Sequence, residues 1–181
     1  MQAVILAGGL GKRMAPMTDN CPKTLLPIAG RPFAHWQLEW LASEGVTEIV
    51  YCVGHLGWQI KDAIGDNFAG MTIKYSEEPE PLGKLDAIRN AYPLLRSWFL
   101  VVYGDSYLDV DINKLVYWFL IGSQNYPLMT TWNGIDYGIS VYHRKMLEVE
   151  EYEINHEWNE IGSPEGFAKL EQLLLERKEI D

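Results

Sequence analysis

Short apolar runs with strand character alternate along this chain with amphipathic segments of helical spacing, and this alternation constrains the fold more than any other feature. Strands are predicted at 2–6, 47–53, 71–75 and 98–103, and helices at 33–43, 57–64 and 83–91. When strands and helices alternate, the strands pair in parallel through right-handed crossovers and the helices cover both faces of the sheet. The predicted fold class is therefore α/β, with a mostly parallel central sheet.

The second half of the chain adds a hairpin and a closing helix to this pattern. The strand-like runs 127–132 and 135–142 are joined by Asn133-Gly134, a pair that favours a tight type I′ turn, so these strands are expected to be antiparallel. Residues 164–177 are amphipathic and begin with proline at the first helical position, which predicts a last helix.

One further predicted helix, 111–121, is apolar almost all round, because Tyr117, Trp118 and Ile121 lie opposite its main apolar stripe. A helix of this kind is buried somewhere. Two interpretations follow. The second apolar side packs within the monomer, or it contacts another subunit in a homo-oligomer.

Length and composition predict one globular domain over residues 1–181. A chain of 181 residues is close to the size of one domain, and its 48% hydrophobic and 22% charged residues are ordinary globular values. The longest apolar run has seven residues, 115–121, against about 20 for a membrane span, and no signal peptide is recognisable. Cys21 and Cys52 lie far apart, so they are interpreted as reduced thiols of a cytoplasmic protein.

The charge of the chain is unevenly distributed. The net charge is −10, which argues against a nucleic-acid partner, yet residues 1–38 carry a net charge of +3. A compact cationic segment in an acidic protein suits a small polyanion, because a few fixed charges suffice to focus the local field.

A glycine-rich loop follows the first predicted strand. Glycines at 8, 9 and 11 let the backbone approach a ligand and direct N–H groups at an anion, while Lys12, Arg13 and Lys23 supply positive charge. By composition this is a phosphate cradle; the alternative is a glycine-rich turn with incidental surface cations. A Walker A loop is excluded because Lys12 is followed by Arg13, and a dinucleotide fingerprint is excluded because Met14 stands where its third glycine belongs.

From this loop onward the chain resembles the nucleotidyltransferases that join a nucleoside triphosphate to a sugar 1-phosphate. The resemblance is carried by LAGGLGKRMAPMT and PKTLLPIAGRP, and it continues through EGVTEIV, GHLGWQI, EEPEPLG and YGDSYLDVD to IGSPEGF. It implies a Rossmann-like three-layer sandwich, a divalent metal, Mg²⁺, and transfer of a nucleoside monophosphate with loss of pyrophosphate. It also implies that the nucleotide lies over Leu6, Ala7, Gly8, Gly9, Gly11 and Lys12.

The resemblance assigns roles to four further side chains. Arg13 would hold the β and γ phosphates, and Lys23 would lie near the α-phosphate and the incoming sugar phosphate. Asp105, at the end of a predicted strand, would bind Mg²⁺; read without the resemblance, it is equally a turn residue. Glu160 stands before a Gly-Ser-Pro turn where many family members carry Asp, and so it is a candidate second metal ligand.

The base side of the nucleotide is expected at EEPEPLG, with Glu78 and Gly83. A carboxylate that accepts two N–H donors fits guanine, whereas an amide would suit uracil or thymine, so GTP is weakly favoured unless Glu78 faces solvent. Two departures from the family put the substrate in doubt. Lys84-Leu85-Asp86 replaces the usual small residues after Gly83, and the Glu-Lys pair of the usual sugar pocket is absent between 132 and 135.

These observations favour a Mg²⁺-dependent nucleotidyltransferase whose partners are a nucleoside triphosphate and a sugar 1-phosphate. The catalytic candidates are Arg13, Lys23 and Asp105. Two alternatives remain: a cytidylyltransferase that acts on a phosphoalcohol such as phosphocholine, and a catalytically silent binding module of the same fold.

Overall fold

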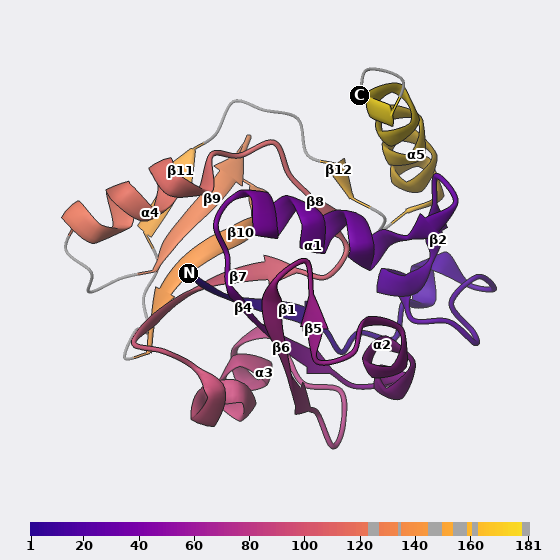
Figure 1. Ribbon diagram of the computed structural model, residues 1–181, viewed down its shortest axis with the longest axis horizontal. Helices are drawn as coiled ribbons and strands as arrows, with labels where there is room; N and C mark the ends of the chain where they lie inside the picture. Colours follow the sequence, from indigo (N-terminus) through magenta and orange to yellow (C-terminus); the bar gives the residue numbers. More distant parts are fainter. Residues whose placement is uncertain (123–126, 134, 145–149, 154–158, 161–162, 179–181) are drawn as a thin grey trace.

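An eight-stranded sheet in the order β11-β9-β10-β7-β1-β4-β6-β5 organises the protein (Figure 1). The computed structural model describes residues 1–122, 127–133, 135–144, 150–153, 159–160 and 163–178, with the backbone alone for 150–153, 159–160 and 177–178. The strands of this sheet are β1 (Gln2–Ala7), β4 (Glu48–Val53), β5 (Asn67–Phe68), β6 (Met71–Glu77), β7 (Trp98–Tyr103), β9 (Leu128–Trp132), β10 (Ile135–His143) and β11 (Glu150–Glu153).

The centre of the sheet is parallel, as predicted. Strand β1 pairs in parallel with β4 and β7, and β4 pairs in parallel with β6. Strand β10 then runs antiparallel to both β7 and β9, while β11 is parallel to β9. The sheet is therefore mixed but mostly parallel, and the α/β prediction is confirmed.

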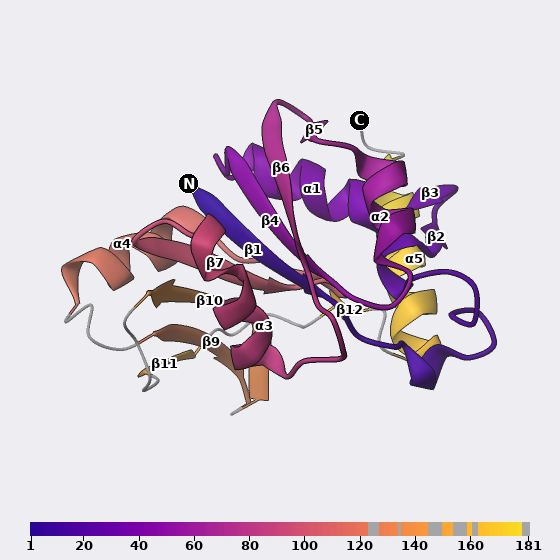
Figure 2. The same cartoon turned by 90° about the horizontal axis from the view of Figure 1, so that it is seen from below.

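Helices cover both faces of the sheet (Figure 2). The helices on the sheet are α1 (Phe33–Ser43), α2 (Gly57–Ile64), α3 (Lys84–Ala91) and α4 (Ile112–Ile121). Helix α5 (Pro164–Lys178) lies apart from this sheet, where its Leu170 and Leu174 are buried with Ile28 and Phe33. Along β1, Ala3 and Ile5 belong to the buried cluster that contains apolar residues of α1, α2 and α4, whereas Val4 belongs to the cluster that contains those of α3. Because both faces are buried, the central strands are continuous apolar runs rather than alternating ones.

The order of the parallel strands reverses at β1. The chain passes from β1 through α1 to β4, then to β6, and returns through α3 on the other face to β7, on the opposite side of β1. In open α/β sheets, ligands bind outside the carboxyl ends of the strands at such a reversal. The fold therefore places a crevice between the ends of β1 and β7.

The predicted helices and longer strands are all present, with boundaries shifted by one or two residues. The hairpin is confirmed as an antiparallel β9–β10 pair in which Ile135 faces Trp132, and Asn133 has the positive φ of 51° that the turn requires; Gly134 lies outside the described residues. The two-residue strands β2 (Pro27–Ile28), β3 (Arg31–Pro32), β5, β8 (Ser106–Tyr107) and β12 (Asn159–Glu160) were not predicted, because two residues show no periodicity. The edge strand β11 was not predicted either, because its sequence EEYE has no apolar run. None of the helices in the described part is long and apolar enough to cross a membrane.

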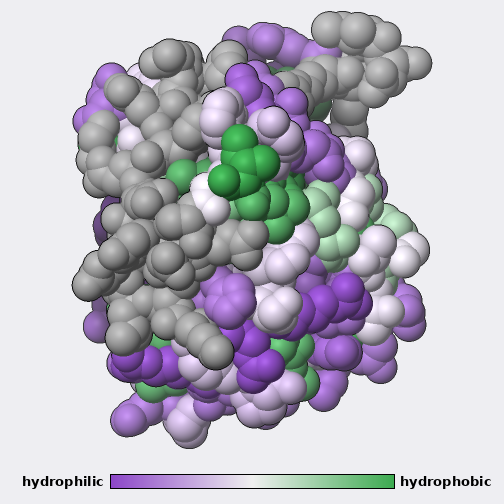
Figure 3. All heavy atoms as spheres, turned by 90° about the vertical axis from the view of Figure 1, so that its left-hand side faces the viewer, coloured by the Kyte–Doolittle hydropathy of each residue, from purple (hydrophilic) through white to green (hydrophobic). Residues whose placement is uncertain are grey.

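The second apolar side of helix α4 is not buried as one interpretation of its sequence predicted. Its stripe Ile112, Leu115, Val116 and Phe119 is buried, but Tyr117, Trp118, Leu120 and Ile121 are exposed, from 44% for Leu120 to 58% for Tyr117. Burial of this second side within the monomer is therefore wrong for the residues that the structure describes. Figure 3, which looks onto the side of the molecule where α4 lies, shows apolar residues gathered on that surface. Contact with a second subunit stays a prediction.

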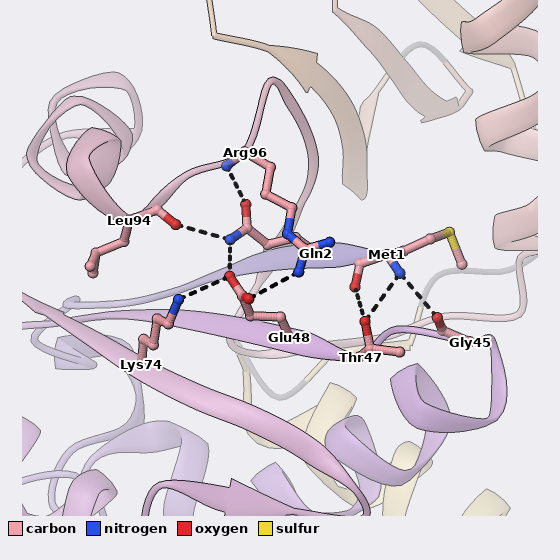
Figure 4. Close-up of polar contacts among 8 residues, drawn as sticks. All are labelled: Met1, Gln2, Gly45, Thr47, Glu48, Lys74, Leu94 and Arg96. Atoms are coloured by element: carbon pink, nitrogen blue, oxygen red, sulfur yellow. Dashed lines mark hydrogen bonds and ion pairs between the residues drawn. The ribbon is translucent and has the colours of Figure 1, made fainter.

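Toward the amino ends of the parallel strands, a polar network joins β1, β4, β6 and the segment before β7 (Figure 4). Gln2, 1% exposed, donates from Nε2 to the carbonyl of Leu94 at 3.0 Å and accepts at Oε1 from the backbone N–H of Arg96 at 2.8 Å. Its Nε2 also contacts Glu48, whose carboxylate forms ion pairs with Lys74 and Arg96. This network lies at the end of β1 opposite to the crevice.

Candidate functional site

The glycine-rich loop leaves β1 at the crevice. Gly11 has a left-handed φ of 63°, and its carbonyl accepts hydrogen bonds from the N–H of Met14 at 2.8 Å and the hydroxyl of Thr18 at 2.9 Å. A Cβ on Gly8 would collide with the carboxylate of Glu78. Glycine thus permits the close approach of Glu78 at Gly8, where a Cβ would displace the carboxylate, and is favoured at Gly11 for the backbone turn.

Lys12 and Arg13 follow this loop in a short 3₁₀ turn. Both side chains are exposed, and within the described residues neither makes a hydrogen bond or an ion pair. Neither of them lines the cleft described next. Two cations beside the mouth of the crevice are therefore available to an anionic ligand.

A cleft of about 260 Å³ lies between the ends of β1 and β7. Its walls come from the β1 end, the loop after it, the segment at Lys23 and the turn after β7: Leu6, Ala7, Gly9, Gly11, Lys23, Thr24, Tyr103, Gly104 and Asp105. Six of the predicted site residues therefore meet in this cleft, at the position that the strand order dictates.

Lys23 and Asp105 form an ion pair in this cleft. Lys23 Nζ lies 2.8 Å from Asp105 Oδ2, and the side chains are 15% and 28% exposed. The turn that carries Asp105 is held against β1, since the N–H of Gly104 donates to the carbonyl of Leu6 at 2.9 Å and a Cβ on Gly104 would lie 2.7 Å from that oxygen. The fold thus juxtaposes a cation and a carboxylate that are 82 residues apart in the sequence.

A second pocket of about 180 Å³ adjoins the cleft and shares Leu6, Gly9 and Tyr103 with it. Its other walls are Gly8, Glu78, Leu82, Lys84 and Ala87. Gly83 does not line this pocket but precedes α3, and its carbonyl accepts from the N–H of Ala87 at 2.9 Å. Predicted phosphate-side and base-side residues therefore lie in neighbouring pockets.

Glu78 is partly buried in the second pocket. Its Oε2 accepts from the backbone N–H of Leu82 at 3.1 Å. Burial raises the pKa of this carboxyl above its usual value, and the hydrogen bond from Leu82 opposes that rise only in part. Glu78 therefore lines the second pocket while keeping part of its surface in solvent, and its contact with a nucleobase stays a prediction.

The raised pKa of Glu78 predicts a pH-dependent stability. An acid whose folded pKa exceeds its unfolded value destabilises the fold above that folded pKa and ceases to do so as pH falls toward the unfolded value. Because Glu78 is only partly buried and solvent screens its charge, we expect Glu78→Gln to raise the free energy of unfolding at pH 7.5 by only about 0.3 kcal/mol, and this gain to vanish by about pH 4. Urea unfolding at both pH values measures it, with Glu77→Gln at the neighbouring exposed carboxylate as control. A gain of equal size at both pH values would contradict the burial effect.

Lys84 connects the second pocket to β10. Its Nζ lies 3.0 Å from both the Tyr103 hydroxyl and Asp136 Oδ2, while Asp136 Oδ1 accepts from the N–H of Gly138 at 3.0 Å. Burial alone would lower the pKa of Lys84, but the electrostatic interactions with Tyr142 and Asp136 and the hydrogen bond with Tyr103 raise it above its usual value. Lys84 thus places a fixed cation beside the predicted base-side residues, as the sequence departure indicated.

The two predicted metal ligands lie on neighbouring segments. Strand β12 pairs antiparallel with β8 so that Glu160 faces Ser106, the residue after Asp105. The side chain of Glu160 lies outside the described residues. Its role as a ligand stays a prediction.

Asp105 fits the way in which proteins bind Mg²⁺. This ion typically takes one or two carboxylates, keeps several waters and uses substrate phosphates for the rest of its shell. Within the described residues no group of three or more His, Cys, Asp or Glu is placed to enclose a metal. Asp105 alone can thus supply one carboxylate ligand to a Mg²⁺ ion, and the binding of that ion stays a prediction.

Several residues of this site escaped the sequence analysis. Thr24 and Tyr103 carry no distinguishing pattern. Asp136 could have been found, because it is an acid inside a predicted strand, and so could Gln37, an amide at a buried position of the apolar stripe of α1. Neither Asp136 nor Gln37 can be assigned to a site from the sequence, because only the arrangement of the sheet shows which residues lie beside them.

Known proteins resemble this chain in sequence and in fold. The sequence model of the family described as "Nucleotidyl transferase" matches residues 2–131. Among curated proteins, N-acetylmuramate alpha-1-phosphate uridylyltransferase of Neisseria meningitidis is 50% identical over 116 residues, which cover 61% of this chain and 49% of that protein. D-glycero-alpha-D-manno-heptose 1-phosphate guanylyltransferase of Campylobacter jejuni is 38% identical over 115 residues, 64% of this chain and 52% of that protein.

The alignments thus span about half the length of these curated relatives. A crystal structure of HddC from Yersinia pseudotuberculosis complexed with GMP-PN superposes on this chain with a TM-score of 0.82 at 22% identity, over 96% of this chain and 99% of that one. At that identity the likeness concerns the fold, and it confirms the Rossmann-like architecture.

Proposed function

Because the chain belongs to the nucleotidyl transferase family, we propose that it transfers a nucleoside monophosphate from a nucleoside triphosphate to a sugar 1-phosphate, with release of pyrophosphate. The observation that carries the proposal is the cleft at the β1–β7 reversal. It has a glycine-rich loop on one wall and the Lys23–Asp105 pair on the other. Such a cleft can hold a polyphosphate chain and a bound cation together.

In this proposal the phosphates lie along the amino-terminal cationic segment. Backbone N–H groups of Gly8, Gly9 and Gly11 face the triphosphate, and the exposed Lys12 and Arg13 close over the β and γ phosphates. Lys23 lies between the α-phosphate and the incoming sugar phosphate. Asp105 and Glu160 would hold Mg²⁺, which supplies further positive charge to the phosphates when bound.

The chemistry requires no nucleophilic side chain. A phosphate oxygen of the sugar phosphate forms a bond to the α-phosphorus, and the bond from that phosphorus to the oxygen bridging to the β-phosphate breaks. Pyrophosphate leaves with the electron pair. The protein contributes by bringing two anions together in line and by offsetting their repulsion, which is the task of Lys23 and Arg13.

The second pocket is proposed to hold the nucleobase between Glu78 and the residues that follow it. The Glu78 carboxylate offers acceptors to base N–H groups, which weakly supports guanine. The guanylyltransferase and the uridylyltransferase named above both align with this chain, so the test must identify the base separately. We place the reaction in the cytoplasm, a proposal that the free thiols Cys21 and Cys52 support.

A screen of pyrophosphate release tests the proposal. Five nucleoside triphosphates, with and without Mg²⁺, are combined with a panel of sugar 1-phosphates and phosphoalcohols. We expect Mg²⁺-dependent release with at least one sugar 1-phosphate. Release only with CTP and phosphocholine would favour the cytidylyltransferase alternative, and no release with any pair would favour the silent binding module.

A further inference from the structure

Gln37 lies on α1 and contacts the turn that carries Asp105. Its side chain is 0% exposed. The Nε2 group donates to the carbonyl of Tyr103 at 2.8 Å and to the carbonyl of Ser106 at 2.7 Å. These two carbonyls bracket Gly104-Asp105, so one amide group holds both ends of the turn.

The same turn is confined from other directions. Gly104 is hydrogen bonded to β1, as described above, and a Cβ on Gly138 of β10 would lie 2.7 Å from the Ser106 hydroxyl. Ser106 is also the residue that pairs with Glu160 of β12. The amide of Gln37 therefore fixes the one segment on which both predicted metal positions depend.

We infer that Gln37 is a positioning residue that sets the direction of the Asp105 carboxylate toward the cleft. Its consequence for the reaction rests on the proposed function; its geometric effect on Asp105 does not. An amide is needed because its NH₂ group can satisfy two carbonyls at once. A carboxylate would place oxygen against oxygen, and an apolar side chain would leave two buried carbonyls without donors.

Gln2, whose amide lies far from the cleft, provides a control for Gln37. Gln2 is 1% exposed, and its amide also bridges two backbone groups, the carbonyl of Leu94 and the N–H of Arg96 (Figure 4). It lies at the amino ends of the strands, far along β1 from the cleft. Gln2→Met and Gln37→Met thus each remove a buried amide that bridges backbone groups, from the two ends of one sheet.

The first test needs no substrate. The coupling between Lys23 and Asp105 is measured by a double-mutant cycle, Lys23→Met with Asp105→Asn, from urea unfolding in three backgrounds: wild type, Gln37→Met and Gln2→Met. In the wild type we expect a coupling of about five-fold in the unfolding equilibrium constant. It should persist in Gln2→Met and vanish in Gln37→Met. Equal coupling in all three backgrounds would overturn the inference.

The second test follows the Mg²⁺ dependence. Calorimetry of nucleoside triphosphate binding at varied Mg²⁺ should show a midpoint raised about ten-fold by Gln37→Met and unchanged by Gln2→Met. In pyrophosphate release, kcat should fall about ten-fold with KM nearly unchanged, and Gln37→Met should add nothing in the Asp105→Asn background. A further fall in kcat when Gln37→Met is added to Asp105→Asn would contradict the inference. So would equal losses of kcat in Gln37→Met and Gln2→Met.

A further variant covers the case in which Gln37→Met does not fold. Gln37→Asn keeps the amide but withdraws it by one methylene, so its effect on the Lys23–Asp105 coupling should be intermediate. A coupling at the wild-type value would then contradict the inference. Failure of wild-type protein to release pyrophosphate would count against the proposed function alone, because the coupling measurement does not involve turnover.

Discussion

Asp105→Asn is expected to lower the rate of Mg²⁺-dependent pyrophosphate release about 10³-fold, the upper range for loss of one preorganised electrostatic partner. Asparagine preserves the volume of the side chain and an oxygen that can face Lys23, but it removes the negative charge that a divalent cation requires. The melting temperature should change little, because the Lys23–Asp105 pair is partly solvated at 15% and 28% exposure and such pairs contribute little to stability.

The matched control for this variant is Asp109→Asn. Asp109 follows the same turn but is exposed and lines neither of the two adjoining pockets. The Asp109→Asn substitution removes the same charge as Asp105→Asn but lies outside the cleft. An Asp105→Asn protein that stays within ten-fold of wild type would remove Asp105 from the reaction.

Lys23→Met should reduce kcat about 10²-fold. In the proposed reaction two phosphate groups approach each other, and Lys23 Nζ, 2.8 Å from Asp105, is the ammonium that lines the cleft where they would meet. Methionine retains most of the side-chain length and packing, so the loss isolates the charge. Initial rates at saturating substrates measure the effect.

Two companion variants decide how the loss is interpreted. Lys114→Met removes an exposed charge on α4, away from the cleft, and should leave the rate unchanged. Lys23→Arg keeps the charge and should recover part of the rate. If Lys23→Arg is as slow as Lys23→Met, the charge is not what Lys23 contributes, and its proposed role between the phosphates is wrong.

The exposed side of α4 shows where periodicity alone misleads. The apolar positions Tyr117, Trp118 and Ile121 predicted burial, but within the described residues the sheet accepts only the stripe that includes Leu115 and Phe119. A helix has one face toward its sheet, and whether something covers the other face depends on neighbours that its own sequence does not encode.

The sequence by itself determined the order of strands and helices, the α/β class and the glycine-rich loop. These properties are local: apolar spacing at a period of 3.6 residues predicts a helix, a short β-branched apolar run predicts a strand, and glycine permits the close approach found at Gly8. The family resemblance, confirmed by the match over residues 2–131, added Arg13, Lys23 and Asp105 as predicted site residues, of which Lys23 and Asp105 line the cleft.

Only the tertiary structure decided which of these residues meet. The pairs Lys23–Asp105, Gln37 with the turn at Tyr103 and Ser106, and Lys84–Asp136 join segments that lie 52 to 82 residues apart. The first two contacts arise because the crossover through α3 brings β7 beside β1 and aligns their carboxyl ends, and the third also needs β10 to pair with β7. Strand order is set by the packing of the whole sheet, so no local pattern in the sequence specifies it.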